Sequence, residues 1–377
     1  MADRVSIAAF RFGYGLPARP EMASAEGLLA ALAGPDEAAE RWPSITVADL
    51  MPVIEEFLRI KKAGKAEADN ARAKANLKDV AGVSDQLAVR GAKAALARAV
   101  GAEDPLRERL VQFWADHFTT VARNRIERAL PATMIEEAIR PNLMRPFAEM
   151  LKAVVTHPAM LIYLNQASSV GPGSRLGMRQ GKGLNENLAR ELLESHTLGV
   201  GAGYAQDDVR QMAELLTGLS LRPGTGFVFD PRQAEPGPET VLGVTYRGEG
   251  VAPIFRALEA LAVRPETARH LAGKLAVHFV SDEPDAGLVS GLEAAWSDSG
   301  GDLAVAIWRS WCGTRRPGCR WRPRHGNRSI LWWHRCALWA FRRMRLMEWK
   351  TAISTGRTCW RRARAWMWHR GPRAMVG

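Results

Sequence analysis

The polar residues with the greatest capacity for chemistry lie close together between Leu184 and Gly199. Glu191 and Glu194 are three residues apart and Asn187 precedes Glu191 by four, so a helix would place all three side chains on one face. Paired carboxylates can bind a cation or act as a general acid and base, and Arg190 on the same face could hold an anionic group. This stretch is therefore a candidate site, for which the sequence names no metal or cofactor.

Helix signals frame the stretch, with Asn185 placed to cap the N-terminus and Gly199 placed just beyond the C-terminus. A helical wheel at about 100° per residue puts His196 and the leucines opposite the glutamates, so His196 is expected to be a core or half-buried histidine. The polar face has two interpretations. It is either a solvated face on which Glu186 and Arg190 pair, contributing about 0.3–0.5 kcal/mol, or the wall of an internal cleft that positions a ligand.

Residues elsewhere in the chain could complete such a site, because helical bundles build sites from inward side chains of facing helices. His117 lies at the edge of the apolar stripe of a buried helix over residues 106–118, and both a hydrogen-bonded core histidine and an acid–base group remain open there. We predict Glu191, Glu194 and His117 as catalytic candidates and Asn187, Arg190, Asp208 and Asn165 as ligand-binding candidates.

Helical periodicity dominates the elements that would position these residues. Residues 49–100 are predicted to form long exposed helices interrupted near Gly82, residues 135–151 a helix kinked at Pro141, and Pro158 the first residue of a helix. Further helices are predicted over residues 25–34, 206–217, 254–261 and 265–280, the last with Ala268, Leu271, Ala272, Leu275 and Phe279 inward.

Two other segments differ from this pattern. Residues 168–183 hold five glycines and are predicted to be a flexible loop, and strands at 227–229 and 240–246 are predicted to pair as one hairpin within residues 225–247. The predicted fold class is mainly α, a multi-helix orthogonal or bundle-like domain over residues 1–307 with one small antiparallel β-hairpin.

The charge of the chain is unevenly distributed. The whole chain of 377 residues carries a formal net charge of +12. Residues 308–377 hold 17 arginines and one lysine against a single acidic residue, Glu348, which gives +17 and leaves −5 for residues 1–307. All four cysteines and ten of the thirteen tryptophans also lie in this tail, at spacings that fit neither a zinc site nor a disulfide framework.

We interpret residues 308–377 as an aberrant, out-of-frame translation of a GC-rich gene, because composition changes abruptly near Ile307. The alternative is a genuine basic, aromatic tail that binds RNA or single-stranded DNA; nucleic acid is not an expected partner otherwise. We predict no secretory signal and no membrane span, and therefore a cytoplasmic protein.

Several strings, taken in order, resemble a known family. They are Phe113 to Phe118, His157-Pro-Ala-Met160, Asn185-Glu-Asn through Thr197-Leu-Gly199, Gly203-Tyr204, Leu216-Thr-Gly218 and Thr240-Val-Leu-Gly243. The chain is identified by them as similar, over about residues 8–307, to the bacterial domain of unknown function 1800 family. This resemblance implies a large helical bacterial protein, often encoded beside a sulfatase-like protein of the domain of unknown function 1501 family, with no established activity.

The chain departs from the family pattern at two places relevant to a site. Ala205 stands where a threonine is common, which removes a helix cap worth about 1 kcal/mol, and Ala234-Glu235 stands where His-Asp is frequent. Three functions remain open: a helical scaffold or accessory protein acting with the sulfatase-like partner, a metal-assisted or acid–base hydrolase at Glu191 and Glu194, and nucleic-acid binding through the tail.

Overall fold

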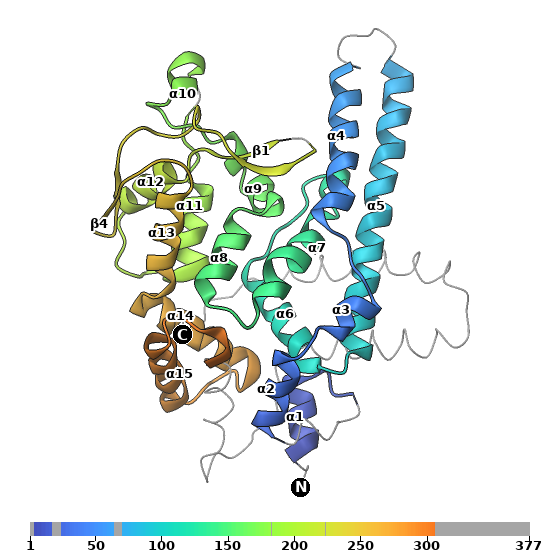
Figure 1. Ribbon diagram of the computed structural model, residues 1–377, viewed down its shortest axis with the longest axis vertical. Coiled ribbons are helices and arrows are strands. Elements are labelled where there is room, and N and C mark those ends of the chain that lie inside the picture. Colours follow the sequence, from blue (N-terminus) through green and yellow to red (C-terminus); the bar gives the residue numbers. More distant parts are fainter. Residues whose placement is uncertain (1–3, 17–23, 64–69, 182, 223, 306–377) are drawn as a thin grey trace, which may run out of the picture. The chain divides into compact units, whose positions relative to one another are not determined.

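The computed structural model describes residues 4–16, 24–63, 70–181, 183–222 and 224–305 (Figure 1). These residues are mostly helical, and their strands form two two-stranded antiparallel sheets. The predicted fold class, mainly α with a small antiparallel β element, is confirmed. Among the described residues, no helix combines the length and the apolar character needed to cross a bilayer. The tail over residues 308–377, with its cysteines, and the nucleic-acid hypothesis that rests on it lie outside the described residues.

Three short helices open the described chain: α1 (Arg4–Phe12), α2 (Ala25–Ala33) and α3 (Glu37–Arg41). Side chains at the N-cap positions define two of these starts, since Ser24 Oγ accepts from Gly27 N at 2.9 Å and Asp36 Oδ1 accepts from Ala39 N at 3.0 Å. Apolar side chains of α1 and α2 join the main hydrophobic core.

Two long helices, α4 (Val47–Ala63) and α5 (Asn70–Gly101), lie side by side and antiparallel (Figure 1). Helix α5 has 32 residues, about 48 Å at 1.5 Å per residue. It runs unbroken through Gly82, so the interruption predicted there is wrong. A Cβ on Gly82 would meet nothing within 4 Å, and a glycine inside a helix costs only about 1 kcal/mol.

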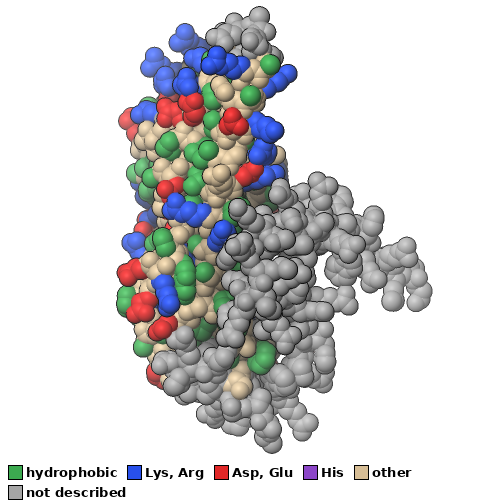
Figure 2. Space-filling view, turned by 90° about the vertical axis from the view of Figure 1, so that its right-hand side faces the viewer, with side chains coloured by type: hydrophobic (Ala, Val, Ile, Leu, Met, Phe, Trp, Pro, Cys, Tyr) green, Lys and Arg blue, Asp and Glu red, His purple; other side chains and the backbone are tan. Residues whose placement is uncertain are grey.

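The outer half of this helix pair, here called the arm (residues 52–63 and 70–80), is largely exposed. No side chain over residues 71–80 is buried, and only Ile60 is buried over residues 52–63. Lysine and arginine side chains gather near its free end (Figure 2). The predicted long exposed helices with a solvated, basic face are therefore confirmed.

The centre of the fold is the buried helix α6 (Pro105–His117) and the short elements that follow it. These are η2 (Arg125–Glu127), α7 (Leu130–Met134), η3 (Ile135–Ile139), η4 (Arg140–Asn142), α8 (Phe147–Val155), α9 (Pro158–Tyr163) and η5 (Gln166–Ser168). Trp114 of α6 is 1% exposed and stacks on Phe147 of α8 with a ring-centroid distance of 5.4 Å. Pro158 begins α9, as predicted. The single helix predicted over residues 135–151 with a kink at Pro141 is wrong. The chain forms η3 and then η4, which contains Pro141, and α8 starts only at Phe147, because proline lacks the N–H that a continuing helix needs.

A buried ion network ties α3, α6 and η4 together. Arg140 donates to both carboxylate oxygens of Glu108 at 2.9 and 2.7 Å and to Asp36 Oδ2 at 2.8 Å. Arg140 is 6% exposed and Glu108 5%. Three segments that are far apart in sequence therefore share one buried arginine.

The glycine-rich segment contains helix α10 (Arg175–Gln180), so it is not an irregular loop throughout. Gly171 and Gly173 lie against the carboxylate of Glu235, which accepts from Gly173 N at 2.8 Å, and a Cβ on Gly171 would collide with that carboxylate. Close approach to a neighbouring chain segment explains the absence of side chains here better than a need for flexibility. The flexibility itself stays a prediction.

The predicted strand pairing is wrong. Strand β1 (Leu219–Arg222) pairs with β2 (Gly226–Phe229), and β3 (Glu239–Val241) pairs with β4 (Val244–Tyr246), which makes two local hairpins instead of one long-range pair. Leu242 and Gly243 form the two-residue turn between β3 and β4 with φ of +50° and +78°. Leucine rarely adopts a positive φ. The turn also lacks the Asn-Gly or Asp-Gly pair that marks such hairpins in a sequence, so local sequence could not predict it.

Three helices complete the described chain: α13 (Ala252–Ala262), α14 (Pro265–Phe279) and α15 (Ala286–Asp298). All five residues predicted to face inward on α14 are buried. Helix α14 packs along α15 and also contacts the π-helical turn η6 (Leu192–Thr197), which brings its polar side chains beside that turn.

Candidate functional site

The polar stretch that carries most site candidates is helix α11 (Asn187–Glu191) continued by a π-helical turn, η6 (Leu192–Thr197). Asn185 Oδ1 accepts from Asn187 N at 3.0 Å, and Gly199 has a φ of +92°, so both helix signals act as predicted. The widened turn shows in Leu198 N, which donates to Leu193 O five residues earlier at 3.0 Å. Such π turns occur frequently at functional sites.

The predicted division of this helix into two faces is confirmed. Asn187 is exposed, Arg190, Glu191 and Glu194 are partly exposed, and His196 is buried at 3% exposure. The apolar face is formed by buried Leu188, Ala189, Leu192 and Leu193.

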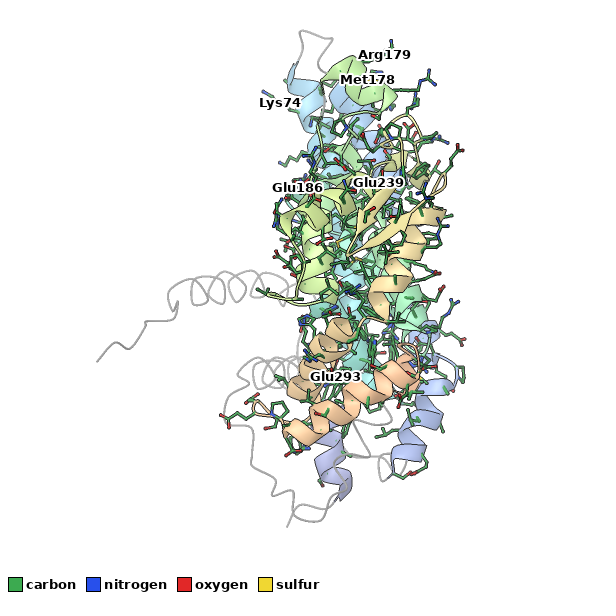
Figure 3. All side chains as sticks on the ribbon, turned by 90° about the vertical axis from the view of Figure 1, so that its left-hand side faces the viewer. Lys74, Met178, Arg179, Glu186, Glu239 and Glu293 are labelled. Atoms are coloured by element: carbon green, nitrogen blue, oxygen red, sulfur yellow. The ribbon has the colours of Figure 1, made fainter. Side chains whose placement is uncertain are left out.

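Arg190 links α11 to α12 (Gln206–Leu215) through a small polar network. Its guanidinium donates to Glu186 Oε2 and to Gln206 Oε1, both at 3.1 Å, and Gln206 Nε2 donates to Glu186 Oε2 at 2.9 Å. Glu194 Oε1 lies 3.7 Å from Arg190 as well. Glu186, labelled in Figure 3, is the acceptor that Arg190 and Gln206 share. Two candidate residues, Arg190 and Glu194, therefore have internal partners.

Asp208 has a structural environment. Its Oδ2 accepts from Ala205 N at 2.8 Å, which anchors the start of α12, and its Oδ1 accepts from Leu242 N at 2.7 Å in the positive-φ turn between β3 and β4. Because Ala205 has no hydroxyl to cap α12, Asp208 contributes the side-chain bond at this helix start.

Replacing Asp208 by alanine is expected to lower the free energy of unfolding by about 2 kcal/mol, because two backbone N–H groups lose their acceptor. The neighbouring exposed Asp207 provides a matched control, and its replacement by alanine is expected to change stability by less than about 0.5 kcal/mol. Urea unfolding of the two variants tests this. Equal losses would show that Asp208 does not hold the turn.

Asn165 is exposed and adopts the left-handed conformation after α9, with φ of +59°. Its carbonyl accepts from Asn185 Nδ2 at 3.1 Å, so it lies at the N-terminal approach to α11. Glu191, by contrast, forms no hydrogen bond or ion pair with any residue that the structure describes. It is the one candidate carboxylate on α11 that is available to a ligand.

His117 lies in a different environment from the glutamates, inside the core at 5% exposure. Its Nε2 is 3.1 Å from the carbonyl oxygen of His196, and Lys274 Nζ is 2.8 Å from its Nδ1. Burial, with Lys274 beside it, lowers the pKa of His117 well below its usual value. The neutral imidazole therefore donates through Nε2 to the π turn and accepts from Lys274 through Nδ1.

Two residues of α14 complete this second cluster, and sequence reasoning missed both. They are Lys274 and His270, whose Nε2 lies 3.3 Å from the carbonyl oxygen of Ser195. The ring centroids of His196 and His270 are 6.0 and 6.3 Å from that of His117. The only sequence signal was the spacing of His270 and Lys274 four residues apart, which places them on one face of a helix.

The predicted site residues thus fall into two groups. Asn187, Arg190, Glu191, Glu194 and Asp208 lie along α11 and α12, whereas His117 belongs to the histidine–lysine cluster. A buried carboxyl that sequence reasoning also missed is Glu239 of β3: burial, with Glu214 and Glu235 nearby, raises its pKa to about 7. Within the described ranges, no group of three or more His, Cys, Asp or Glu side chains could hold a metal ion.

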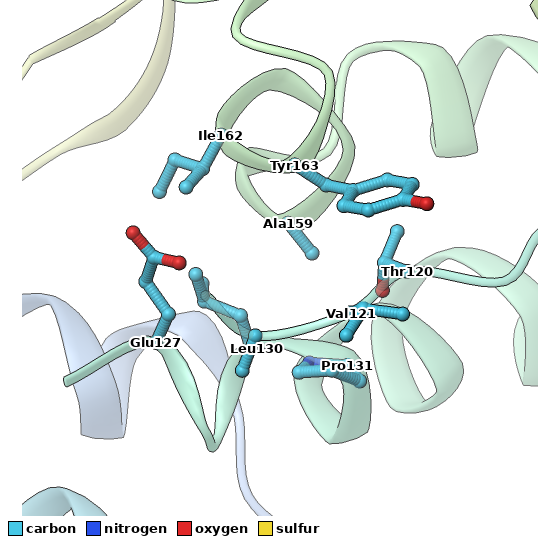
Figure 4. Close-up of a pocket in the computed structure, with 9 residues that line it drawn as sticks. Thr120, Val121, Glu127, Leu130, Pro131, Ala159, Ile162 and Tyr163 are labelled. Atoms are coloured by element: carbon cyan, nitrogen blue, oxygen red, sulfur yellow. The ribbon is translucent and has the colours of Figure 1, made fainter. Parts of the chain in front are cut away.

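A shallow pocket of about 180 Å³ lies beside α7 and α9 (Figure 4). Its wall is mostly apolar, with Glu127 and the hydroxyls of Thr120 and Tyr163 as polar groups. Because this volume includes space open to solvent, the enclosed part of the pocket is far smaller than the roughly 300–1,000 Å³ of a usual ligand pocket. None of the predicted site residues lines it.

Comparison with known proteins gives one family match. The family model described as "Protein of unknown function (DUF1800)" matches residues 8–309. No curated protein and no solved structure matches the chain.

Proposed function

The chain belongs to the DUF1800 family of proteins of unknown function, and from this premise we propose that it is a helical scaffold or accessory protein that holds a partner protein. The observation that carries the proposal is the arm formed by α4 and α5. Two packed helices bury only one side each, and most of their stability must come from tertiary packing. A further protein surface along the arm would supply that packing.

Half-exposed aliphatic side chains mark where such a surface would pack. Leu58 in the arm is 45% exposed, and Val83 and Val89, on the part of α5 that follows the arm, are 44% and 37% exposed. Lys62 and Lys74, near the free end of the arm, are exposed and would supply a polar rim. Protein interfaces commonly combine an apolar centre with such a rim.

The polar face of α11 supports a scaffold more than a catalyst. Arg190 and Asp208 each join two elements of the fold through hydrogen bonds. A carboxylate that anchors backbone N–H groups is not free to exchange protons. As partner we propose the sulfatase-like protein of the DUF1501 family that the resemblance implies, and as location the cytoplasm.

The arm is tested by measuring the affinity of the full-length chain for that sulfatase-like protein by calorimetry. The double variant Leu58→Glu/Val83→Glu is expected to weaken binding at least about tenfold, or 1.4 kcal/mol. Val263→Glu is the matched control, since Val263 is 48% exposed on a different helix end, and it should bind like the unmodified chain. Absence of any complex contradicts the scaffold proposal, and equal affinities for all three chains contradict the assignment of the arm.

The hydrolase alternative rests on Glu191, the candidate carboxylate without an internal partner. Replacing it by glutamine is expected to change the free energy of unfolding by less than about 0.5 kcal/mol, because no contact is lost. If the same variant loses hydrolysis of a sulfate or phosphate ester that the unmodified chain performs, the alternative replaces the scaffold. A large loss of stability would instead make Glu191 a structural residue.

A further inference from the structure

The environment of Lys274 is unusual for a lysine in this chain. Its Nζ has one hydrogen-bond partner, the Nδ1 atom of the buried His117 at 2.8 Å. Among the described residues it forms no ion pair with any carboxylate. The Lys274 side chain is half-buried, and no described carboxylate is bonded to its ammonium group.

Lys152, by contrast, forms ion pairs with two carboxylates. Its Nζ lies 2.9 Å from Glu149 Oε1 and 2.6 Å from Glu259 Oε1. These two carboxylates raise the pKa of Lys152 against the opposing effect of burial. For Lys274 the balance is reversed: burial lowers its pKa, and the charge of Asp116 opposes this only in part.

Three histidines interact with Lys274, whereas the charge of Asp116 acts on it without a hydrogen bond or an ion pair among the described residues. His117 and His270 both use Nε2 on carbonyl oxygens of the π turn, and His196 is 3% exposed with an unpartnered Nδ1. Neutral imidazoles can accept a hydrogen bond from an amine but do not stabilise its cation as a carboxylate does. A lysine in such surroundings is nucleophilic, because the neutral amine is the reactive form.

We propose that Lys274 is a nucleophilic amine that takes up a small aldehyde or ketone as an imine. The lone pair of the neutral amine forms a bond to the carbonyl carbon while the C=O π pair moves to oxygen. The two amine protons then leave with that oxygen as water, and a C=N bond remains. The step needs no oxidant or reductant. His117 is a positioning residue that holds Nζ in place, and this activity is independent of the proposed scaffold role.

The test is reductive trapping on the full-length native chain, with acetaldehyde as the probe and cyanoborohydride to fix the imine. Mass spectrometry of peptides gives the rate at each lysine. Lys274 is expected to react at least threefold faster than the exposed Lys61, Lys62 and Lys74, and at least tenfold faster than Lys152. The preference should disappear in the urea-unfolded chain. This comparison uses the unmodified chain, so it does not depend on whether a variant folds.

A rate at Lys274 equal to or below that of the exposed lysines overturns the proposal. A preference that persists in urea overturns it as well, because it would come from local sequence and not from the cluster. A Lys274→Arg chain identifies the labelled peptide, since its signal should vanish while labelling of Lys152 stays the same.

Discussion

Replacing Arg140 by methionine is expected to lower the free energy of unfolding by about 3–5 kcal/mol. Arg140 is 6% exposed and satisfies both oxygens of Glu108, which is itself 5% exposed. Removal of the guanidinium leaves that carboxylate buried without a counter-charge. Asp36 loses its partner too, but its side chain is 22% exposed and can reach water.

Two further variants distinguish the effect of the unpaired Glu108 charge from the loss of buried side-chain volume. The double variant Arg140→Met/Glu108→Met removes both charges, so it should recover most of the stability that the single variant loses. Arg125→Met removes a partner of Asp85 at a site where Arg125 is 44% exposed, and there the expected loss is at most about 1 kcal/mol. Urea unfolding of the three chains gives the comparison. A double variant no more stable than Arg140→Met would mean that packing, and not the orphaned charge, dominates.

Stability is expected to fall as the pH drops below about 6.5, the ordinary pKa of an unfolded histidine. Burial lowers the pKa of His196 to about 3 in the folded chain and that of His117 well below its usual value. The unfolded chain therefore binds protons in this window and the folded chain does not. The stabilising contribution is complete above pH 6.5 and is lost as the pH falls towards the folded pKa.

The size of the effect follows from the same linkage. His196 contributes a loss of about 1.4 kcal/mol per pH unit inside the window, or about 2 kcal/mol between pH 6.5 and 5, and His117 acts in the same direction. Glu239, whose pKa is raised to about 7 in the folded chain, acts in the opposite direction, because there the folded chain binds a proton that the unfolded chain does not. Free energies of unfolding measured at pH 7.5, 6.5, 5.5 and 5 should show this slope. His196→Gln should reduce the slope by about 1.4 kcal/mol per unit, although it also lowers stability at every pH.

The matched control for this slope is Thr197→Val. Thr197 is buried beside His196 and its Oγ1 donates to Leu192 O at 2.7 Å, so its replacement disturbs the same π turn without removing a titrating group. That variant should be less stable with an unchanged slope. A slope that is the same in His196→Gln and the unmodified chain would show that other groups cause the acid sensitivity.

Local patterns allowed several parts of the candidate site to be predicted. The alternation of leucines and polar residues in α11 correctly separated buried His196 from the glutamates, and Asn185 and Gly199 correctly marked its ends. The family motifs were also correct, since the family model spans residues 8–309. The partners of those side chains were not predictable, because Asp208 bonds to Leu242 and His117 to Lys274 only after distant segments have packed.

The sequence by itself determined the helical class, the inward face of α14 and the helix start at Pro158, because periodicity and proline geometry act over a few residues. Only the tertiary structure decided which strands pair, where the π turn falls, and that Arg140 joins Glu108 to Asp36. These outcomes depend on which surfaces meet across long stretches of chain. A buried charge or a positive-φ leucine is tolerated only when its distant partner is in place.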